Sequence, residues 1–219
     1  MAAPLSLPRA ILFDWDNTLV DNWGVIRAAL NAALIAMGHE PWTLEETRTR
    51  VRASLRDSFP AMFGERWREA ERIFYETFAA THLQELREMA GAGAMLAGLA
   101  GQGIALGVVS NKRGTFLRAE AEQLGWVAHF RRLVGAGDAA RDKPAPDPVR
   151  LALQDSGIAP GPAVWFVGDT DIDLACGLES GCVPVLLRAE PPAPDEFPRH
   201  PPALHLRNCS ELTEIIAKL

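Results

Sequence analysis

The sequence predicts an α/β fold: a parallel β-sheet with helices on both faces, and a helical subdomain inserted into the sheet domain. Short apolar runs alternate with longer amphipathic segments along most of the chain, which is the pattern of strand–helix–strand units. The apolar runs are continuous rather than alternating, as expected for strands that are buried on both faces. At 219 residues the chain is long enough for one such domain with an insertion.

The strands and helices of the sheet domain can be placed in order along the chain. We expect strands over residues 10–13, 104–109, 132–136, 163–167, 183–187 and 203–206. A helix should follow the second strand, from Arg113 to a C-cap at Gly125. Another should begin with Asp147 as N-cap and Pro148 at the first helical position. Residues 188–204 contain six prolines and are expected to form an extended loop before the last strand, which a C-terminal helix follows.

The interval between residues 22 and 89 interrupts this alternation of strands and helices. It contains only helical patterns, over residues 23–38, 43–55 and 65–86, with a loop expected at 59–64. The interval is too long for an ordinary connection between two strands. We therefore predict a helical cap over residues 22–89 and a Rossmann-like core made of residues 1–21 and 90–219.

Composition and charge argue against several functional classes. A net charge of −6 and a pI near 5.4 do not suit a protein that binds nucleic acid or a membrane surface, since such a protein needs a basic face. No apolar run approaches the roughly 18 residues that span a bilayer, and no signal-peptide pattern is visible. The three cysteines lack metal-like spacing and are expected to be reduced thiols. We expect a cytoplasmic monomer or homodimer without nucleic-acid or membrane partners.

Polar side chains gather at the carboxyl ends of the predicted strands, where ligands bind in open α/β sheets. They are Asp14 and Asp16 after the first strand, Ser110 and Asn111 after the second, Lys143 in the loop before the fourth, and Asp169, Asp171 and Asp173 after the fourth. Taken singly, each has an ordinary explanation, such as a helix cap for Ser110, a favourable helix dipole for Asp173 or a solvated charge for Lys143.

Taken together, these acids indicate a bound divalent cation, because clustered carboxylates with few bases nearby would repel one another. A site built from carboxylate oxygens suits Mg²⁺, which commonly binds through one or two carboxylates together with a substrate phosphate. This combination points to phosphoryl transfer. One carboxylate, Asp14, can act as the nucleophile, and Asp16 on the same side of the strand end can donate and then accept a proton.

Four segments of the chain resemble, in order and in strand context, the four motifs of the haloacid dehalogenase superfamily of phosphohydrolases. They are "DWDNT", "SNK", "KPAPDP" and "GDTDID". The resemblance covers the whole chain, including the cap between the first and second motifs. Three segments are most similar to sequences of the phosphoglycolate phosphatase-like branch: "VVSNK", "DKPAPDP" and "VGDTDIDLACGLESG". The resemblance implies a Mg²⁺-dependent phosphatase that hydrolyses a small-molecule phosphate monoester through an aspartyl-phosphate.

The resemblance also implies roles for the four acids of the site. Asp14 would be the nucleophile and a magnesium ligand, and Asp16 the general acid and base, with its main-chain carbonyl on the metal. Asp169 would be the second carboxylate on magnesium. Asp173 would lie outside the ligand set and orient either metal-bound water or the lysine.

The remaining motif residues would bind the phosphoryl group. Ser110 would donate a hydrogen bond to it, helped by the backbone of Asn111. Lys143 would hold Asp14 and the phosphoryl oxygens together. Thr18 would steady the turn after the first strand and could contact phosphate, whereas Asp171 has no expected catalytic role.

Other activities of the same superfamily fit the sequence less well. Haloacid dehalogenases lack the acid that stands here as Asp16, and a phosphonatase needs a lysine in the cap. The lysines of this chain all lie outside the predicted cap, at Lys112, Lys143 and Lys218. A non-catalytic relative would be expected to have lost a motif acid. A sugar phosphomutase of the β-phosphoglucomutase type, whose second acid precedes Gly-Val rather than Asn-Thr-Leu, stays open, as does a nucleotide monophosphatase.

Substrate choice is expected to depend on the cap, which in such enzymes closes over the site. His39 and Trp42 lie in the loop where the family places its specificity residues, and Arg56 could pair with a substrate carboxylate. A solvated loop position for His39 and a packing role for Trp42 are equally open.

Overall fold

The computed structural model describes residues 5–219, and the chain divides into two compact units. The first, which we call the sheet unit, runs to Val20 and resumes over Glu88–Leu219. The second, the helical unit, comprises Asp21–Arg87. The chain therefore leaves and re-enters the sheet unit at Val20 and Glu88, which pair with each other in an antiparallel bridge.

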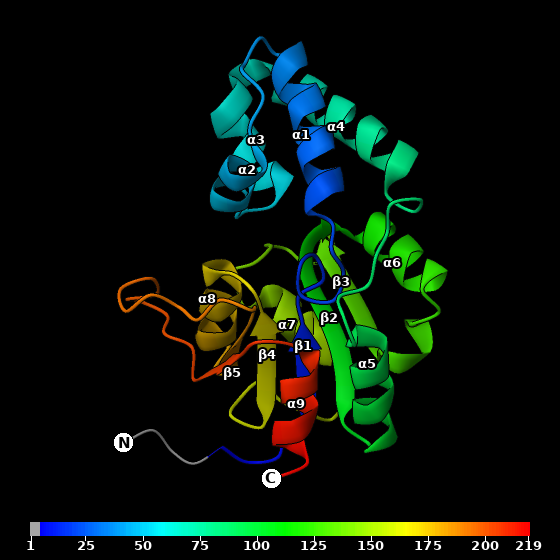
Figure 1. The fold of residues 1–219 in the computed structure, drawn as a ribbon, viewed down its shortest axis with the longest axis vertical. Helices are drawn as coiled ribbons and strands as arrows, with labels where there is room; N and C mark the ends of the chain where they lie inside the picture. The colour runs from blue at the N-terminus through cyan, green and yellow to red at the C-terminus, as the bar shows by residue number, and fades with distance from the viewer. Residues whose placement is uncertain (1–4) are drawn as a thin grey trace. The chain divides into compact units, whose positions relative to one another are not determined.

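The sheet unit is built on one six-stranded sheet with the strand order β3-β2-β1-β4-β5-β6 (Figure 1). Its strands are β1 Ala10–Phe13, β2 Ala105–Arg113, β3 Arg132–Ala136, β4 Val164–Gly168, β5 Val183–Leu187 and β6 Leu204–Leu206. All neighbouring pairs are parallel, which confirms the predicted fold class. The chain order runs outward in one direction from β1 and in the other from β4, so the boundary between β1 and β4 is the switch point where such folds bind ligands.

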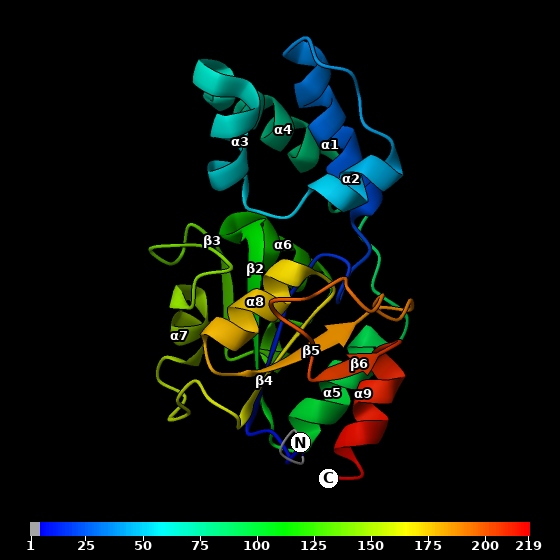
Figure 2. The same cartoon turned by 90° about the vertical axis from the view of Figure 1, so that its left-hand side faces the viewer.

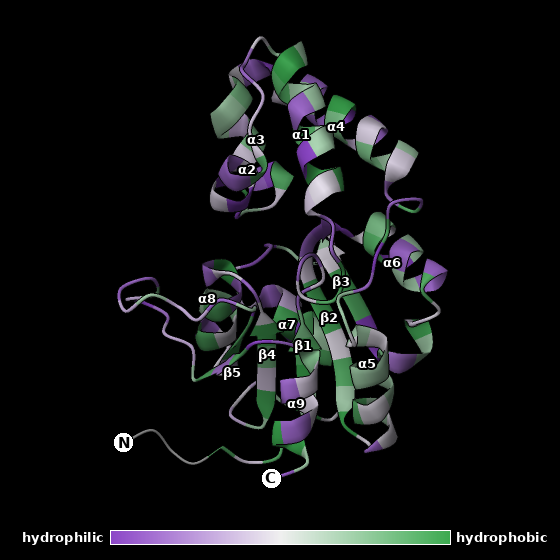
Figure 3. Cartoon of the chain, in the orientation of Figure 1, coloured by the Kyte–Doolittle hydropathy of each residue, from purple (hydrophilic) through white to green (hydrophobic). Residues whose placement is uncertain are grey.

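Helices cover both faces of this sheet. They are α5 Ala92–Gly101, α6 Gly114–Gln123, α7 Asp147–Leu153, α8 Asp171–Glu179 and α9 Cys209–Ile216, with a 3-10 turn, η2, at Val127–His129. Helices α7 and α8 lie on one face, and α5, α6 and α9 on the other, as Figures 1 and 2 show together. Leu12, Val149, Phe166 and Cys176 belong to the core beneath α7 and α8. The central strands are hydrophobic (Figure 3), and no helix among residues 5–219 is long and apolar enough to cross a membrane.

Strand β2 extends beyond its predicted end at Val109. Its pairing with β3 shifts register between Val109 and Arg113, so Ser110 and Asn111 lie in an irregular stretch of the strand and not after its end, where we expected them. Strand irregularities of this kind commonly redirect side chains beside active sites.

The prediction that Asp147 caps α7 is wrong. Asp147 is the first residue of the helix and Pro146 is its N-cap, because the Pro146 carbonyl accepts the first hydrogen bond of the helix, from the Arg150 N–H at 3.1 Å. The Asp147 carboxylate instead accepts a hydrogen bond from Arg141 at 2.7 Å.

The helical unit contains α1 Trp23–Ala36, α2 Leu44–Arg50, α3 Leu55–Phe63 and α4 Trp67–Thr81, with a 3-10 turn, η1, at Gly64–Arg66. The loop predicted at residues 59–64 is wrong, since most of this stretch forms the second half of α3. Phe59 and Phe63, four residues apart, share one face of that helix, with ring centroids 4.9 Å apart. Phe59 also meets Phe74 of α4 edge-on at 6.0 Å, so aromatic packing stabilises the helix despite Pro60 in its interior.

The loop between β5 and β6, hydrophilic in Figure 3, is fixed by Arg188. Its guanidinium donates to both carboxyl oxygens of Glu196, at 2.7 and 2.5 Å, and lies 5.4 Å from the ring centroid of Phe197. The predicted extended loop is therefore folded back on itself at this point.

Helix α6 begins in direct contact with β3. A Cβ added to Gly135 would lie 2.4 Å from the Cα of Gly114, much closer than real contacts allow. Only glycine at position 135 permits this approach of backbone to backbone, whereas a Cβ on Gly114 would meet the Asp138 carboxylate at 2.6 Å.

We expect Gly135→Ala to lower the free energy of unfolding by about 2 kcal/mol, because the backbone of Gly114 cannot move aside as a side chain would. Gly98→Ala is the matched control: its Cβ would meet nothing within 4 Å, and in α5 alanine should stabilise the protein by up to about 1 kcal/mol. Denaturant unfolding measures both. Equal stability of Gly135→Ala and the parent would contradict the close packing described here.

Candidate active site

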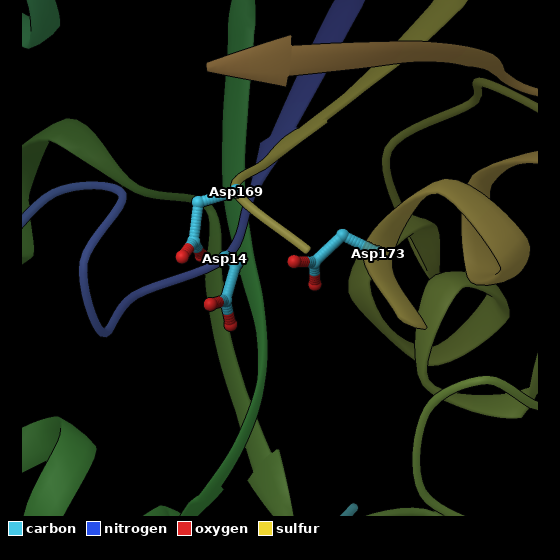
Figure 4. A group of neighbouring side chains, drawn as sticks. All are labelled: Asp14, Asp169 and Asp173. Carbon is cyan, nitrogen blue, oxygen red and sulfur yellow. The ribbon is translucent and has the colours of Figure 1, made fainter. Parts of the chain in front are cut away.

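Three carboxylates meet at the switch point of the sheet. Asp14 directly follows β1, Asp169 directly follows β4, and Asp173 lies in the first turn of α8. Because β1 and β4 are adjacent, one oxygen from each carboxylate lies within 4.8 Å of the others (Figure 4). The structure thus brings together three acids that come from both segments of the sheet unit's sequence.

Asp173 reaches this position because Gly168 has no side chain. A Cβ on Gly168 would lie 2.3 Å from the Cβ of Asp173. The Asp173 carboxylate is also the acceptor of a capping box, in which Oδ2 receives hydrogen bonds from the backbone N–H of Thr170 at 3.0 Å and from its hydroxyl at 2.7 Å. The start of α8 therefore fixes Asp173.

Lys143 joins two of the three acids. Its Nζ donates to Asp14 Oδ1 at 2.5 Å and to Asp173 Oδ1 at 2.7 Å, and the residue is only 2% exposed. The loop that carries it is held by Asn111, whose side-chain amide donates to the Lys143 carbonyl at 3.1 Å and accepts from the Lys143 N–H at 3.0 Å. The Asn111 side chain thus positions the lysine, a role the sequence did not suggest.

Burial and mutual repulsion dominate the electrostatics of the cluster. Burial raises the pKa of Asp14 to about 6, since the favourable charge of Lys143 is opposed by Asp173 and only partly compensates. Burial, followed by the charges of Asp173 and Asp14, raises the pKa of Asp169 well above its ordinary value. Burial works against the charge of Lys143, but Asp14 and Asp173 outweigh it and raise the pKa of the ammonium. One permanent cation among three acids leaves a charge deficit that a divalent cation would neutralise.

The three acids are not equivalent as metal ligands. Both oxygens of Asp173 already accept hydrogen bonds, Oδ1 from Lys143 and Oδ2 from Thr170. Asp14 and Asp169 are better suited to hold a cation, and a donor set of oxygens alone fits Mg²⁺. The assignment of Asp14 and Asp169 as metal ligands, with Asp173 outside the ligand set, stays a prediction.

The turn after β1 supports Asp169. The N–H groups of Leu19 and Val20 both donate to the carbonyl of Trp15, and Asn17 adopts a left-handed backbone with φ 65°. Thr18, which is 1% exposed, donates its hydroxyl to Asp169 Oδ1 at 3.3 Å. Thr18 therefore steadies the turn and orients a carboxylate, while a contact with phosphate stays a prediction.

The other predicted residues divide between this end of the sheet and the surface. Ser110 is 5% exposed at the irregular end of β2, where its Oγ accepts a hydrogen bond from the Lys112 N–H at 3.2 Å. Asp171 is exposed at the start of α8, as its lack of an expected role would suggest. Asp16 lies near the cluster in sequence but has a separate cationic partner, Lys112, whose Nζ is 2.8 Å from Asp16 Oδ1.

Sequence reasoning missed Lys112 and Glu120. Lys112 Nζ contacts the two carboxyl oxygens of Glu120 at 2.8 and 2.7 Å, and Trp15 Nε1 donates to Glu120 Oε2 at 2.7 Å. The sequence did contain a signal for Glu120. It stands three residues after Leu117 and therefore lies on the same face of α6, which is the buried face of that helix. A buried glutamate on an apolar face requires a partner, and Lys112 is the nearest lysine in sequence.

Comparisons with known proteins show which family this chain belongs to. A model of haloacid dehalogenase-like hydrolases matches residues 11–186. A phosphoglycolate phosphatase from Photorhabdus laumondii is 30% identical over 185 residues, which cover 80% of this chain and 77% of the relative. An N-acetylmuramic acid 6-phosphate phosphatase from Pseudomonas aeruginosa is 29% identical over 197 residues, which cover 88% and 87%. The solved structure of a hydrolase of this superfamily from Ehrlichia chaffeensis covers 99% of both chains with a TM-score of 0.67 and 26% identity.

The chain therefore belongs to the haloacid dehalogenase-like hydrolase family, and within it to the phosphoglycolate phosphatase-like branch. The resemblance predicted from the four motifs is confirmed.

We expect Lys143→Met to lower the free energy of unfolding by about 3 kcal/mol near neutral pH in metal-free buffer, because it leaves buried carboxylates without their cation. The pKa of Asp14 is raised from 3.8 to about 6, so the penalty for ionising it is present above the higher value and absent below the lower one. Loss of Lys143 raises that pKa further. The stability deficit should therefore shrink as the pH falls.

Thermal and denaturant unfolding across this pH range test the expectation, with Lys218→Met, which replaces an exposed lysine, as the control. A deficit that is the same at acidic and neutral pH would show that the loss comes from packing and not from charge.

Proposed function

We propose that the protein is a Mg²⁺-dependent phosphatase that hydrolyses a small, phosphoglycolate-like phosphate monoester through an aspartyl-phosphate on Asp14. The observation that carries the proposal is the pairing of buried Asp14 with Lys143, 2.5 Å away, beside Asp169 at the switch point. With a pKa of about 6, Asp14 is mostly ionised at neutral pH and able to attack phosphorus. Free, buried thiols at all three cysteines suit the cytoplasmic location that we propose.

The residues divide the reaction into two steps. In the first, a carboxylate oxygen of Asp14 bonds to phosphorus while the bond to the ester oxygen breaks, and that oxygen takes a proton from Asp16. In the second, Asp16 takes a proton from water while the water oxygen bonds to phosphorus and the bond between phosphorus and the Asp14 carboxyl oxygen breaks, which releases inorganic phosphate and restores the Asp14 carboxylate. Lys143 and Ser110 would neutralise and orient the phosphoryl oxygens. Mg²⁺, held by Asp14, Asp169 and the carbonyl of Asp16, would stabilise the charge on the transferring group.

The choice of substrate class follows from the relatives. One is named a phosphoglycolate phosphatase and another an N-acetylmuramic acid 6-phosphate phosphatase, and both names describe small phosphate monoesters. A phosphate-release screen over phosphorylated acids, sugars and nucleotides identifies the preferred ester and separates the proposal from a nucleotide monophosphatase. A phosphomutase of the β-phosphoglucomutase type would instead return an isomeric sugar phosphate without net release of phosphate.

We further propose that the helical unit acts as the cap that selects the leaving group. It contains its own cavity of about 320 Å³, lined by His39, Trp42, Arg50 and Phe63 among others. Arg50 lies 4.8 Å from the ring centroid of Trp42, and the His39 ring meets Phe63 edge-on at 5.6 Å. The two candidate specificity residues therefore border this open pocket, which gives them a surface for recognition as well as packing.

Asp14→Asn should abolish Mg²⁺-dependent phosphate release while the fold survives, because the amide is a poor nucleophile and a weaker metal ligand. We expect a loss of at least about 10³-fold in kcat. Asp171→Asn, an exposed change in the same group of motifs, should retain activity. Full activity in Asp14→Asn, or in the parent enzyme with excess chelator, would contradict the mechanism.

Mg²⁺ binding should weaken as the pH falls through about 6, because a proton on Asp14 competes with the metal. The expected change approaches roughly tenfold per pH unit for each proton displaced. Calorimetric titration with Mg²⁺ in buffers of different ionisation enthalpy measures both the affinity and the protons released. Asp171→Asn should follow the same profile, and an affinity unchanged between mildly acidic and neutral pH would exclude Asp14 as a titrating ligand.

A further inference from the structure

A ring of buried contacts links Asp16 to helix α6. Lys112 Nζ lies 2.8 Å from Asp16 Oδ1 and also contacts both carboxyl oxygens of Glu120. Glu120 Oε2 accepts a hydrogen bond from Trp15 Nε1 at 2.7 Å. Since Trp15 and Asp16 are neighbours in the chain, these four side chains form a closed ring.

The members of this ring have little freedom to move. The side chains of Lys112 and Glu120 are 4% and 0% exposed, and Trp15 is completely buried. The Trp15 ring is held edge-on by Trp126 at 5.8 Å and by Phe130 at 6.4 Å. A lysine normally has a long flexible side chain, but here Glu120 fixes the position of the ammonium from a different element.

The ring gives Asp16 a different ion-pair partner from Asp14, although both acids follow the end of β1. Asp14 is paired with Lys143, whereas Asp16 is paired with Lys112. An ammonium only donates hydrogen bonds, so its contact with Asp16 Oδ1 disfavours a proton on that oxygen. When Asp16 carries a proton, the proton is therefore directed to Oδ2. The contact determines both the orientation of the carboxyl group and the atom that holds the proton.

We propose that Lys112, held in place by Glu120, is a positioning residue that orients the Asp16 carboxyl group for proton transfer to the leaving oxygen. The inference rests on the proposed function, because that function makes Asp16 the general acid. It goes beyond it by assigning a purpose to a buried ion pair outside the metal and phosphoryl contacts.

The test compares two substrates that differ in their need for an acid. An alkyl phosphate from the screen must protonate its leaving oxygen, whereas para-nitrophenyl phosphate loses a stable phenolate without help. The quantity measured is kcat/KM, which reports only the steps up to departure of the leaving group. The main variant is Lys112→Met combined with Glu120→Gln, because replacing both residues avoids leaving the fully buried Glu120 carboxylate without its cation.

We expect kcat/KM of the double variant to fall by about 10- to 100-fold for the alkyl phosphate, within the range of general acid catalysis, and by less than about 3-fold for para-nitrophenyl phosphate. Asp16→Asn should show the same selectivity more strongly. Glu122→Gln, an exposed change on the same helix, should alter neither value. Thermal unfolding of each variant shows whether it is folded at the assay temperature.

Glu120→Gln alone keeps the side-chain shape and provides a second, milder test if the double variant does not fold. It should lower the alkyl-to-aryl ratio of kcat/KM in the same direction by a smaller factor. An equal loss of kcat/KM for both substrates, or no loss for the alkyl phosphate, would overturn the positioning role of Lys112. The proposed function would still stand in that case, provided that the wild-type enzyme turns over both substrates. If the wild-type enzyme hydrolyses neither substrate, the proposed function itself is overturned.

Discussion

The buried ammonium of Lys143 is the interaction on which the rest of the site depends. Three carboxylates within 4.8 Å of one another would not stay together in a buried position without a nearby cation. Lys143 supplies one positive charge, and its two short contacts fix Asp14 relative to Asp173. The features around it serve the same end: Asn111 holds the lysine backbone, and Gly168 allows Asp173 to approach. The remaining excess of negative charge is what makes the site suited to a metal ion.

Two lysines give the two acids of the first motif different environments. Asp14 is held against Lys143 in a buried cluster of like charges, whereas Asp16 contacts Lys112, whose charge is shared with Glu120. Each acid therefore has its own cationic partner, although the two acids are only two residues apart in the chain. The alternation of side chains along an extended backbone places Trp15 on the opposite side, where it anchors the second of these arrangements.

Much of this could be predicted from the sequence because local patterns determine it. Continuous apolar runs identified the strands, and the residues after them identified Asp14, Asp169 and Asp173 as neighbours. The sequence could not reveal the side-chain contacts of Asn111, since an amide that clamps a distant loop leaves no periodic signal. Glu120 was missed for a similar reason, as a charged residue in an amphipathic helix is usually exposed. Residues 59–63 form a helix where we expected a loop, because aromatic packing overrides the tendency of Pro60 to interrupt a helix.

The way in which the chain leaves the sheet unit connects the site to the insertion. Val20 and Glu88 form an antiparallel backbone bridge, and the Met89 N–H donates to the carbonyl of Leu19 at 2.8 Å. The outgoing and returning segments of the chain therefore stabilise each other at the border of the sheet unit. The outgoing segment is the end of the same turn that places Thr18 against Asp169. Because entry and exit are adjacent, a long insertion requires no opening of the core, and the entropic cost of closing it grows only slowly with its length. The geometry of the carboxylates can therefore be set within the sheet unit alone, which leaves the helical unit free to vary with the substrate.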